Sequence, residues 1–225
     1  MRVLVVTAVA AEAEAVAATG DTGTLPRGGY TLTRTPGLDV LAAGVGPAAA
    51  AAATATALTL ADEPYALVVS AGIGGGFTGR APLGSLVVSD AIVAADLGAD
   101  TPDGYLPVDE LGFGRTVHHP PATLSARAAE ALGAAHAPVL TVSTVTGTAA
   151  RAAELAVRHP RAAAEAMEGF GVAEAAAAHG VPVLEIRAVS NAVGPRDRAA
   201  WRIGDALAAL RDGFGRLTPV LQEHL

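Results

Sequence analysis

One short segment near the C-terminus, residues 185–191, combines charged and polar side chains that could do chemistry. The two-residue period of a strand places Glu185, Arg187 and Asn191 on one face. Because the neighbouring residues are apolar, Arg187 is expected to be buried and therefore to need a carboxylate opposite it. Asn191 falls at the C-terminal end of the strand, where α/β sheets bind ligands. A purely structural ion pair is the alternative.

Two other carboxylates stand at positions suited to a site. Glu12 directly follows a predicted first strand, so it is expected to point into the crevice above the sheet. The alternative is a first-turn acid that complements a helix dipole, a role that Glu14 can also play. Glu168, beside Met167, lies at the entry to a predicted helix. There it is either a solvated acid or a bidentate acceptor for a diol, and the pattern alone leaves both open.

Two glycine-rich segments resemble nucleotide-binding loops. Residues 44–49 read GVGPAA, but a dinucleotide site would need an acidic residue after the next strand, and Asp62 and Glu63 fall before it. Residues 72–76 read GIGGG and include Ile73 and Gly74, at the predicted end of a parallel strand. Glycines there would let a flat ring or a sugar approach the backbone. A plain tight turn fits the second segment equally well.

Composition excludes several kinds of chemistry. The chain has 225 residues, no Cys, and only Arg among its 15 basic residues, which excludes disulfides, thiolate nucleophiles, Schiff-base lysines and a Walker-type loop. A net charge of −7 argues against nucleic acid or an anionic membrane as partner. The adjacent His118 and His119 cannot easily share one ion, and no companion ligands have suitable spacing. We expect neither a metal nor a cofactor.

The remaining pattern predicts one α/β domain over residues 1–225, with a central mixed, largely parallel sheet flanked by helices. The predicted elements are strands at 2–9, 66–70, within 83–95, 138–144 and 183–190; a hairpin pair at 30–34 and 39–43; helices from 47 to before 62, at 148–159, at 167–179 and from 203 onward, with Pro219 ending or kinking the last; a turn-rich stretch at 20–29; and a long excursion at 98–121. A secretory signal at the N-terminus is disfavoured because Glu12 and Glu14 follow at once, and no run is long enough to span a membrane. A cytoplasmic protein is expected.

Four motifs, in order and at matching spacing, resemble the nucleoside phosphorylase/nucleosidase superfamily over nearly the whole chain. They are Glu12, the 72–76 glycine segment, Met167-Glu168, and the 187–191 segment RAVSN. In the branch that cleaves methylthioadenosine and adenosylhomocysteine, the resemblance implies that Glu12 activates water. It also implies that the glycine segment, with Ile73 and Gly74, lines the ribose, and that Met167 and Glu168 hold the sugar.

The resemblance carries two further implications. Gly147 and Thr148 match a family segment that touches the base through its backbone. Members of the superfamily are usually homo-oligomers, so a homo-oligomer that binds a nucleoside is expected here.

Two positions depart from the nucleosidase pattern. Ile73 stands where many relatives have Ser, and Asn191 stands where they have Asp. The whole pattern, including TVSTVTGTAA, AMEGFGVA and RAVSNAVGPRDRAAW, is most similar to the futalosine hydrolases, which release hypoxanthine on the futalosine route to menaquinone. Independently, an Asn amide nitrogen can donate to the two acceptors of a 6-oxopurine, O6 and N7, whereas a protonated Asp suits adenine. Asn191 therefore favours hypoxanthine or guanine.

Water is favoured over phosphate as the nucleophile. Phosphate needs a cationic, hydroxyl-rich pocket, whereas position 73 offers Ile and Glu12 would repel an anion. The expected mechanism has Glu12, oriented by Arg187, take the proton of the attacking water while Asn191 holds the leaving base. The alternatives are a methylthioadenosine/adenosylhomocysteine nucleosidase, a 6-oxopurine nucleoside phosphorylase, and a non-catalytic nucleoside-binding protein, which would be favoured if Glu12 faced away from the pocket.

Overall fold

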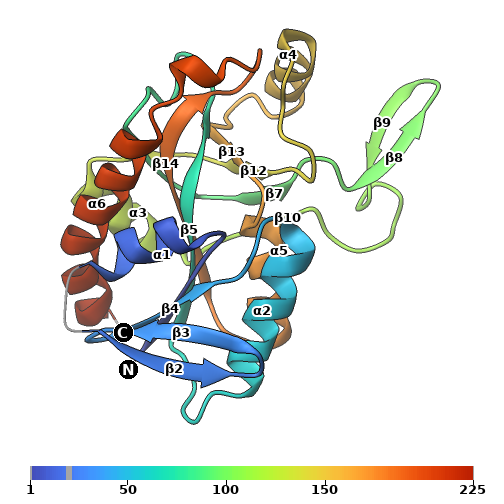
Figure 1. Ribbon diagram of the computed structural model, residues 1–225. Helices are drawn as coiled ribbons and strands as arrows, with labels where there is room; N and C mark the ends of the chain where they lie inside the picture. Colours follow the sequence, from blue (N-terminus) through green and yellow to red (C-terminus); the bar gives the residue numbers. More distant parts are fainter. Residues whose placement is uncertain (1, 19–21, 225) are drawn as a thin grey trace.

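A mixed sheet forms the centre of the molecule, and helices cover both of its faces (Figure 1). The computed structural model describes residues 2–18 and 22–224. The strands are β1 Val3–Thr7, β2 Gly23–Arg27, β3 Tyr30–Arg34, β4 Leu38–Ala42, β5 Leu67–Gly76, β6 Leu86–Val88, β7 Ile92–Ala94, β8 Gly98–Thr101, β9 Gly104–Pro107, β10 Val117–His118, β11 Ala135–His136, β12 Val139–Thr141, β13 Ala164–Ala166 and β14 Val183–Ala192. The helices are α1 Ala10–Ala17, α2 Pro47–Thr59, α3 Ala122–Leu132, α4 Ala149–Arg158, α5 Gly169–Ala178, the short 3-10 turn Arg198–Ala200, and α6 Ile203–His224.

Strand β5 is the centre of the sheet. On one edge it pairs in parallel with β14 along nearly its whole length. On the other edge its first half pairs in parallel with β1, and its last residues pair antiparallel with β13. The predicted mixed, largely parallel sheet is therefore confirmed, and so is the antiparallel hairpin of β3 and β4.

Apolar residues of small and medium size fill both sides of the sheet. Helices α1, α3 and α6 pack on one face, and α2 and α5 pack on the other, as their positions in Figure 1 show. The strands β1 and β5 supply Val and Leu side chains that are almost completely buried. Within the described part of the chain, no helix is long and apolar enough to cross a membrane.

The structure corrects several predicted elements. The glycine segment 72–76 is the second half of β5, because β14 pairs with it throughout; it is not a turn beyond the strand. The 98–121 excursion contains the projecting β8–β9 hairpin and β10 (Figure 1). Of the turn-rich stretch 20–29, residues 23–27 form β2, while residues 20 and 21 lie outside the described part. The segment 83–95 holds two strands, and α6 continues past Pro219.

Candidate active site

A cavity of about 320 Å³ opens at the C-terminal ends of β1, β5 and β14. Its lining includes six of the predicted site residues, namely Glu12, Ile73, Gly74, Met167, Glu168 and Asn191. It also includes two residues that the sequence analysis did not single out, Glu165 and Trp201. A volume of this size accommodates a small organic ligand. The structure therefore brings together most of the side chains that were proposed from motifs far apart in the sequence.

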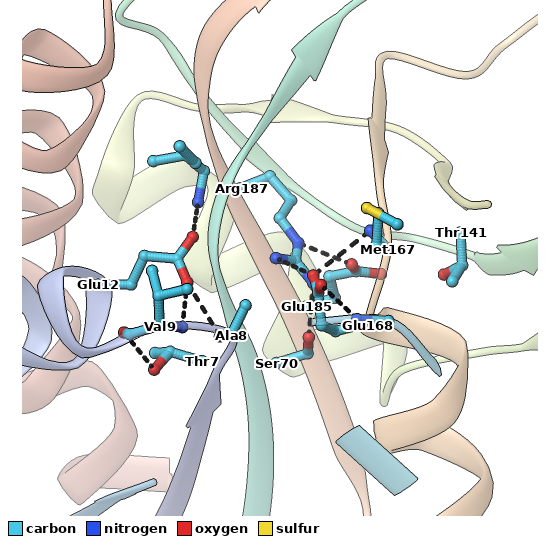
Figure 2. Close-up of polar contacts among 12 residues, drawn as sticks. Thr7, Ala8, Val9, Glu12, Ser70, Thr141, Met167, Glu168, Glu185 and Arg187 are labelled. Carbon is cyan, nitrogen blue, oxygen red and sulfur yellow. Dashed lines mark hydrogen bonds and ion pairs between the residues drawn. The ribbon is translucent and has the colours of Figure 1, made fainter. Parts of the chain in front are cut away.

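Backbone amides fix the carboxylate of Glu12. The N–H groups of Ala8 and Val9 donate to Oε2 over 2.9 and 3.2 Å (Figure 2). The N–H of Ile73 donates to Oε1 over 2.8 Å. The side chain is only 3% exposed. Glu12 follows β1 at the start of α1, so the same turn that ends the strand supplies two of the three donors. Because each carboxylate oxygen can accept more than one bond, Glu12 keeps acceptor capacity for a ligand.

Arg187 is completely buried and binds three side chains. It donates from Nε to Glu185 Oε1 over 2.9 Å, from Nη1 to Glu168 Oε2 over 3.3 Å and from Nη2 to Ser70 Oγ over 2.8 Å (Figure 2). The expectation that Arg187 orients Glu12 is thus corrected, because none of these hydrogen bonds reaches Glu12. Arg187 orients Glu168 instead, and its own strand neighbour Glu185 supplies the second carboxylate.

The buried charges around Arg187 stabilise one another's ionised forms. Burial raises the pKa of Glu185, and Arg187 partly opposes that rise. Burial also disfavours the charge on Arg187, but Glu185, Glu168 and Glu12 together hold the pKa of the guanidinium above its usual value. Glu12 therefore acts on Arg187 through its charge. Removing one side chain from such a buried ion-pair cluster destabilises the protein, because the remaining charge is left without its partner.

Glu168 begins α5 and faces the cavity. Its Oε1 accepts a 3.1 Å hydrogen bond from the backbone N–H of Gly46, and its Oε2 accepts one of 3.3 Å from the N–H of Met167 besides that from Arg187. The residue is 5% exposed, so it is no solvated terminal acid. A carboxylate held in this way offers its remaining lone pairs to hydroxyl groups of a ligand.

Asn191 lies just beyond a bulge in β14. The register with β5 shifts between Val189 and Asn191, so strict alternation stops before this residue is reached. Its Nδ2 donates to the carbonyl of Ala192 over 3.0 Å, and its Oδ1 accepts from Ser190 Oγ over 2.9 Å. Because a carbonyl oxygen can only accept, the contact with Ala192 fixes which end of the amide carries hydrogens. The second N–H of Nδ2 stays available to a ligand.

Besides the buried Arg187, two predicted site residues do not line the cavity. Gly147 and Thr148 are exposed at the start of α4, where the Thr148 side chain accepts a hydrogen bond from the N–H of Arg151 over 3.2 Å and caps the helix. From the preceding segment, Val145 reaches the cavity wall. The family segment therefore reaches the cavity through Val145, two residues before Gly147.

Glu165 and Trp201, which were not predicted as site residues, stand out only weakly in the sequence. Glu165 is the one charged residue in the otherwise apolar run at 162–166, and that isolation could have marked it. Trp201 is the only Trp of the chain, and Arg196 lies over its ring at 5.0 Å from the ring centre. Neither pattern by itself indicates which wall of a cavity the residue forms.

The adjacent histidines bind different groups. His118 Nε2 lies 2.8 Å from a carboxylate oxygen of Glu174, whereas His119 Nδ1 lies 3.2 Å from the carbonyl of Asp90. Over residues 2–18 and 22–224, no group of three or more His, Cys, Asp or Glu side chains is placed to hold a metal ion.

The chain is similar to known proteins over its whole length. The family model of the Phosphorylase superfamily matches residues 2–217. A futalosine hydrolase of Streptomyces coelicolor is 69% identical, over 99% of this chain and 97% of that protein. A futalosine hydrolase of Acidothermus cellulolyticus is 49% identical, over 95% of this chain and 89% of that protein.

Solved structures share the fold at lower sequence identity. A 5′-methylthioadenosine/S-adenosylhomocysteine nucleosidase from Colwellia psychrerythraea in complex with adenine has a TM-score of 0.80 and 22% identity, covering 100% of this chain and 96% of that one. A futalosine hydrolase mutant of Helicobacter pylori has a TM-score of 0.80 and 18% identity, covering 100% of both chains. At these identities the likeness establishes the arrangement of the sheet and helices.

Proposed function

Because the chain belongs to the Phosphorylase superfamily, and within it to the futalosine hydrolases, we propose that it hydrolyses the N-glycosidic bond of futalosine. The products are hypoxanthine and dehypoxanthine futalosine, in a step of menaquinone biosynthesis. The observation that carries the proposal is Glu12, a buried carboxylate in the cavity wall that three backbone amides hold in place. A carboxylate fixed in this way is suited to take a proton from water and unsuited to share its site with phosphate.

The cavity residues divide the remaining tasks. Asn191 Nδ2 donates to the O6 and N7 edge of the base and stabilises the negative charge that develops as the C1′–N9 bond breaks. Glu168, positioned by Arg187 and Gly46, accepts hydrogen bonds from the ribose hydroxyls, and Met167 packs against the sugar. The sugar gains oxocarbenium character, as in other glycoside hydrolyses, and water activated by Glu12 attacks C1′. No cofactor enters these steps.

The competing functions receive less support. A phosphorylase would need donors for an anion, but the cavity lining offers the Ile73 side chain and the acidic groups of Glu12, Glu165 and Glu168. A methylthioadenosine or adenosylhomocysteine nucleosidase would need a group that accepts from the adenine amine, whereas the free end of Asn191 donates. A non-catalytic binder was expected to turn Glu12 away from the pocket, and Glu12 lines it.

A substrate panel tests the proposal. The protein is incubated with futalosine, inosine, methylthioadenosine and adenosylhomocysteine, with and without phosphate, and the released bases and sugars are identified by chromatography. We expect hypoxanthine and a free sugar from futalosine, at a rate that neither phosphate nor a metal chelator changes. A sugar 1-phosphate that forms only with phosphate present would identify a phosphorylase. Faster cleavage of the adenine nucleosides would identify the other nucleosidase.

We also propose the oligomeric state, the partners and the location of the protein. The superfamily resemblance supports a homo-oligomer, which size-exclusion chromatography with light scattering can test. The net charge of −7 supports a protein that binds neither nucleic acid nor anionic membranes. A cytoplasmic location agrees with a small-molecule substrate, and cell fractionation can test it.

A further inference from the structure

Glu165 is a buried carboxylate in the cavity wall to which the mechanism above assigns no task. It lies in β13 and is 4% exposed, in a run of alanines whose other members pack in the core. Burying a charge is costly unless it is paired or well hydrogen-bonded. Glu165 therefore requires hydrogen-bond partners that offset the cost of its burial.

Thr146 donates two hydrogen bonds to this carboxylate. Its backbone N–H donates to Glu165 Oε1 over 2.8 Å, and its hydroxyl donates to Oε2. Burial raises the pKa of Glu165 above its usual value, and the two hydrogen bonds from Thr146 oppose that rise only in part. Both carboxylate oxygens accept from Thr146, and each has a further lone pair after these bonds are made. The group therefore presents acceptor capacity to the cavity.

The sheet places Glu165 opposite Asn191. Both residues are cross-strand neighbours of Gly75, Glu165 from β13 on one edge of β5 and Asn191 from β14 on the other. Two strand spacings separate their Cα atoms by about 10 Å. Gly75 has no side chain, and a Cβ there would lie 2.9 Å from Val193 Cγ2 and 3.2 Å from Asn191 Nδ2, so Val193 and Asn191 pack closely against this glycine. Glu165, Gly75 and Asn191 all line the cavity, so its wall carries a donor on one side of Gly75 and an acceptor on the other.

This pair of groups matches the hydrogen-bonding edge of a 6-oxopurine. Such a base has O6 in the middle of the edge, the acceptor N7 on one side and the donor N1–H on the other. Asn191 can serve O6 and N7, but its amide cannot also reach the far side. We propose that Glu165 accepts the N1–H of the base in a charge-assisted hydrogen bond and so sets the base specificity together with Asn191.

The arrangement also explains how adenine is excluded. Adenine has an unprotonated N1, so its lone pair would face the lone pairs of Glu165, while its amino group would face the N–H of Asn191. The backbone N–H of Thr146, which could otherwise donate to such an N1, is already bound to Glu165. Both sides of the base are then mismatched. The inference rests on the proposed function, because it assumes that the cavity receives a 6-oxopurine.

The test is a titration calorimetry experiment with free bases. Wild type, Glu165→Gln and the control Glu154→Gln, a surface carboxylate of α4, are titrated with hypoxanthine, 1-methylhypoxanthine and adenine. Gln can still accept from Thr146 through its amide oxygen but turns an N–H₂ group toward the base. We expect Glu165→Gln to bind hypoxanthine roughly 10- to 100-fold more weakly without a matching loss for adenine, the effect of one mismatched buried group. Glu154→Gln should behave as wild type.

Three outcomes separate the possible failures. If Glu165→Gln keeps the wild-type ratio of hypoxanthine to adenine binding, Glu165 does not read the base. If that variant does not fold, the wild type decides, because binding of 1-methylhypoxanthine as tight as that of hypoxanthine would equally overturn the inference. If wild type neither binds hypoxanthine nor cleaves futalosine, the proposed function itself fails.

Discussion

The backbone N–H of Ile73 donates a 2.8 Å hydrogen bond to Glu12 Oε1 and thereby ties the start of α1 to the middle of β5. The bond uses the peptide group, so the side chain at position 73 takes no part in it and can be apolar. The same contact faces the carboxylate toward the cavity that both residues line. Holding Glu12 in place therefore does not require a polar side chain at position 73.

Glu12→Gln should reduce kcat about 10²- to 10⁴-fold, because the amide cannot take a proton from water. Gln also has only one acceptor oxygen for three backbone donors, so some of the loss will come from a displaced side chain. Glu14→Gln, on the exposed side of the same helix, is the matched control and should leave kcat unchanged. Steady-state kinetics with futalosine measure both, and near-normal turnover of Glu12→Gln would remove Glu12 as the base.

Gly72→Ala should impair activity although it adds a single methyl group. A Cβ at this position would lie 2.6 Å from Glu12 Oε1 and 2.8 Å from Arg187 Nη1, so it would displace Glu12, the proposed general base, and the guanidinium that orients Glu168. We expect kcat/KM to fall at least about 10-fold, in line with the sensitivity of catalysis to small misplacements. Gly204→Ala, where a Cβ meets nothing within 4 Å, is the control. Equal kinetics of the two variants would contradict this account.

Stability in acid should depend on Asp39, away from the cavity. Burial alone would raise its pKa, but hydrogen bonds from Arg34, Arg2 and Tyr65 outweigh that and lower the pKa to about 2, against 3.8 for the free group. A lowered folded-state pKa means that the stabilisation is present above pH 3.8 and is lost as pH falls toward about 2. The expected contribution is about 2 kcal/mol.

The free energy of unfolding of wild type and Asp39→Asn, measured by urea titration at several pH values, tests this expectation. The variant should be less stable near neutral pH and should lose the pH dependence below about pH 4. Asp62→Asn, whose carboxylate pairs with Arg27 but is 81% exposed, should change stability by less than about 1 kcal/mol. A parallel pH dependence in wild type and Asp39→Asn would assign the acid sensitivity to other groups.

The sequence was sufficient to predict where the site lies, but it was not sufficient to predict which side chains pair within the site. Apolar β-branched runs and their order were enough to predict the sheet, and carboxylates at strand ends pointed to the crevice. Burial of Arg187 was predictable, but three carboxylates lie near it, and choosing among them requires coordinates. A tight turn was one of the two predictions for the glycines of β5, because Gly disfavours strand interiors. Pairing with β14 along their whole length overrides that preference.

Asn191→Asp should erode the preference for hypoxanthine over adenine. The amide of Asn191 keeps one N–H free in the cavity wall, because its Oδ1 already accepts from Ser190 and its other hydrogen binds the Ala192 carbonyl. An ionised Asp in its place would lose that donor and face O6 and N7 with lone pairs. A protonated Asp would donate to N7 and accept from the amino group of adenine, so it would suit the other base.

The expected shift is about 1–3 kcal/mol in the relative kcat/KM for futalosine and its adenine counterpart, the cost of one mismatched buried hydrogen-bonding group. Full reversal is not expected, because Glu165 still opposes an unprotonated N1 in the variant. Combining Asn191→Asp with Glu165→Gln should therefore shift the ratio further than either change alone. The measurement is kcat/KM for both substrates in wild type, the two single variants and the double variant. An unchanged ratio in Asn191→Asp would show that this side chain does not contact the purine, whatever its place in the cavity.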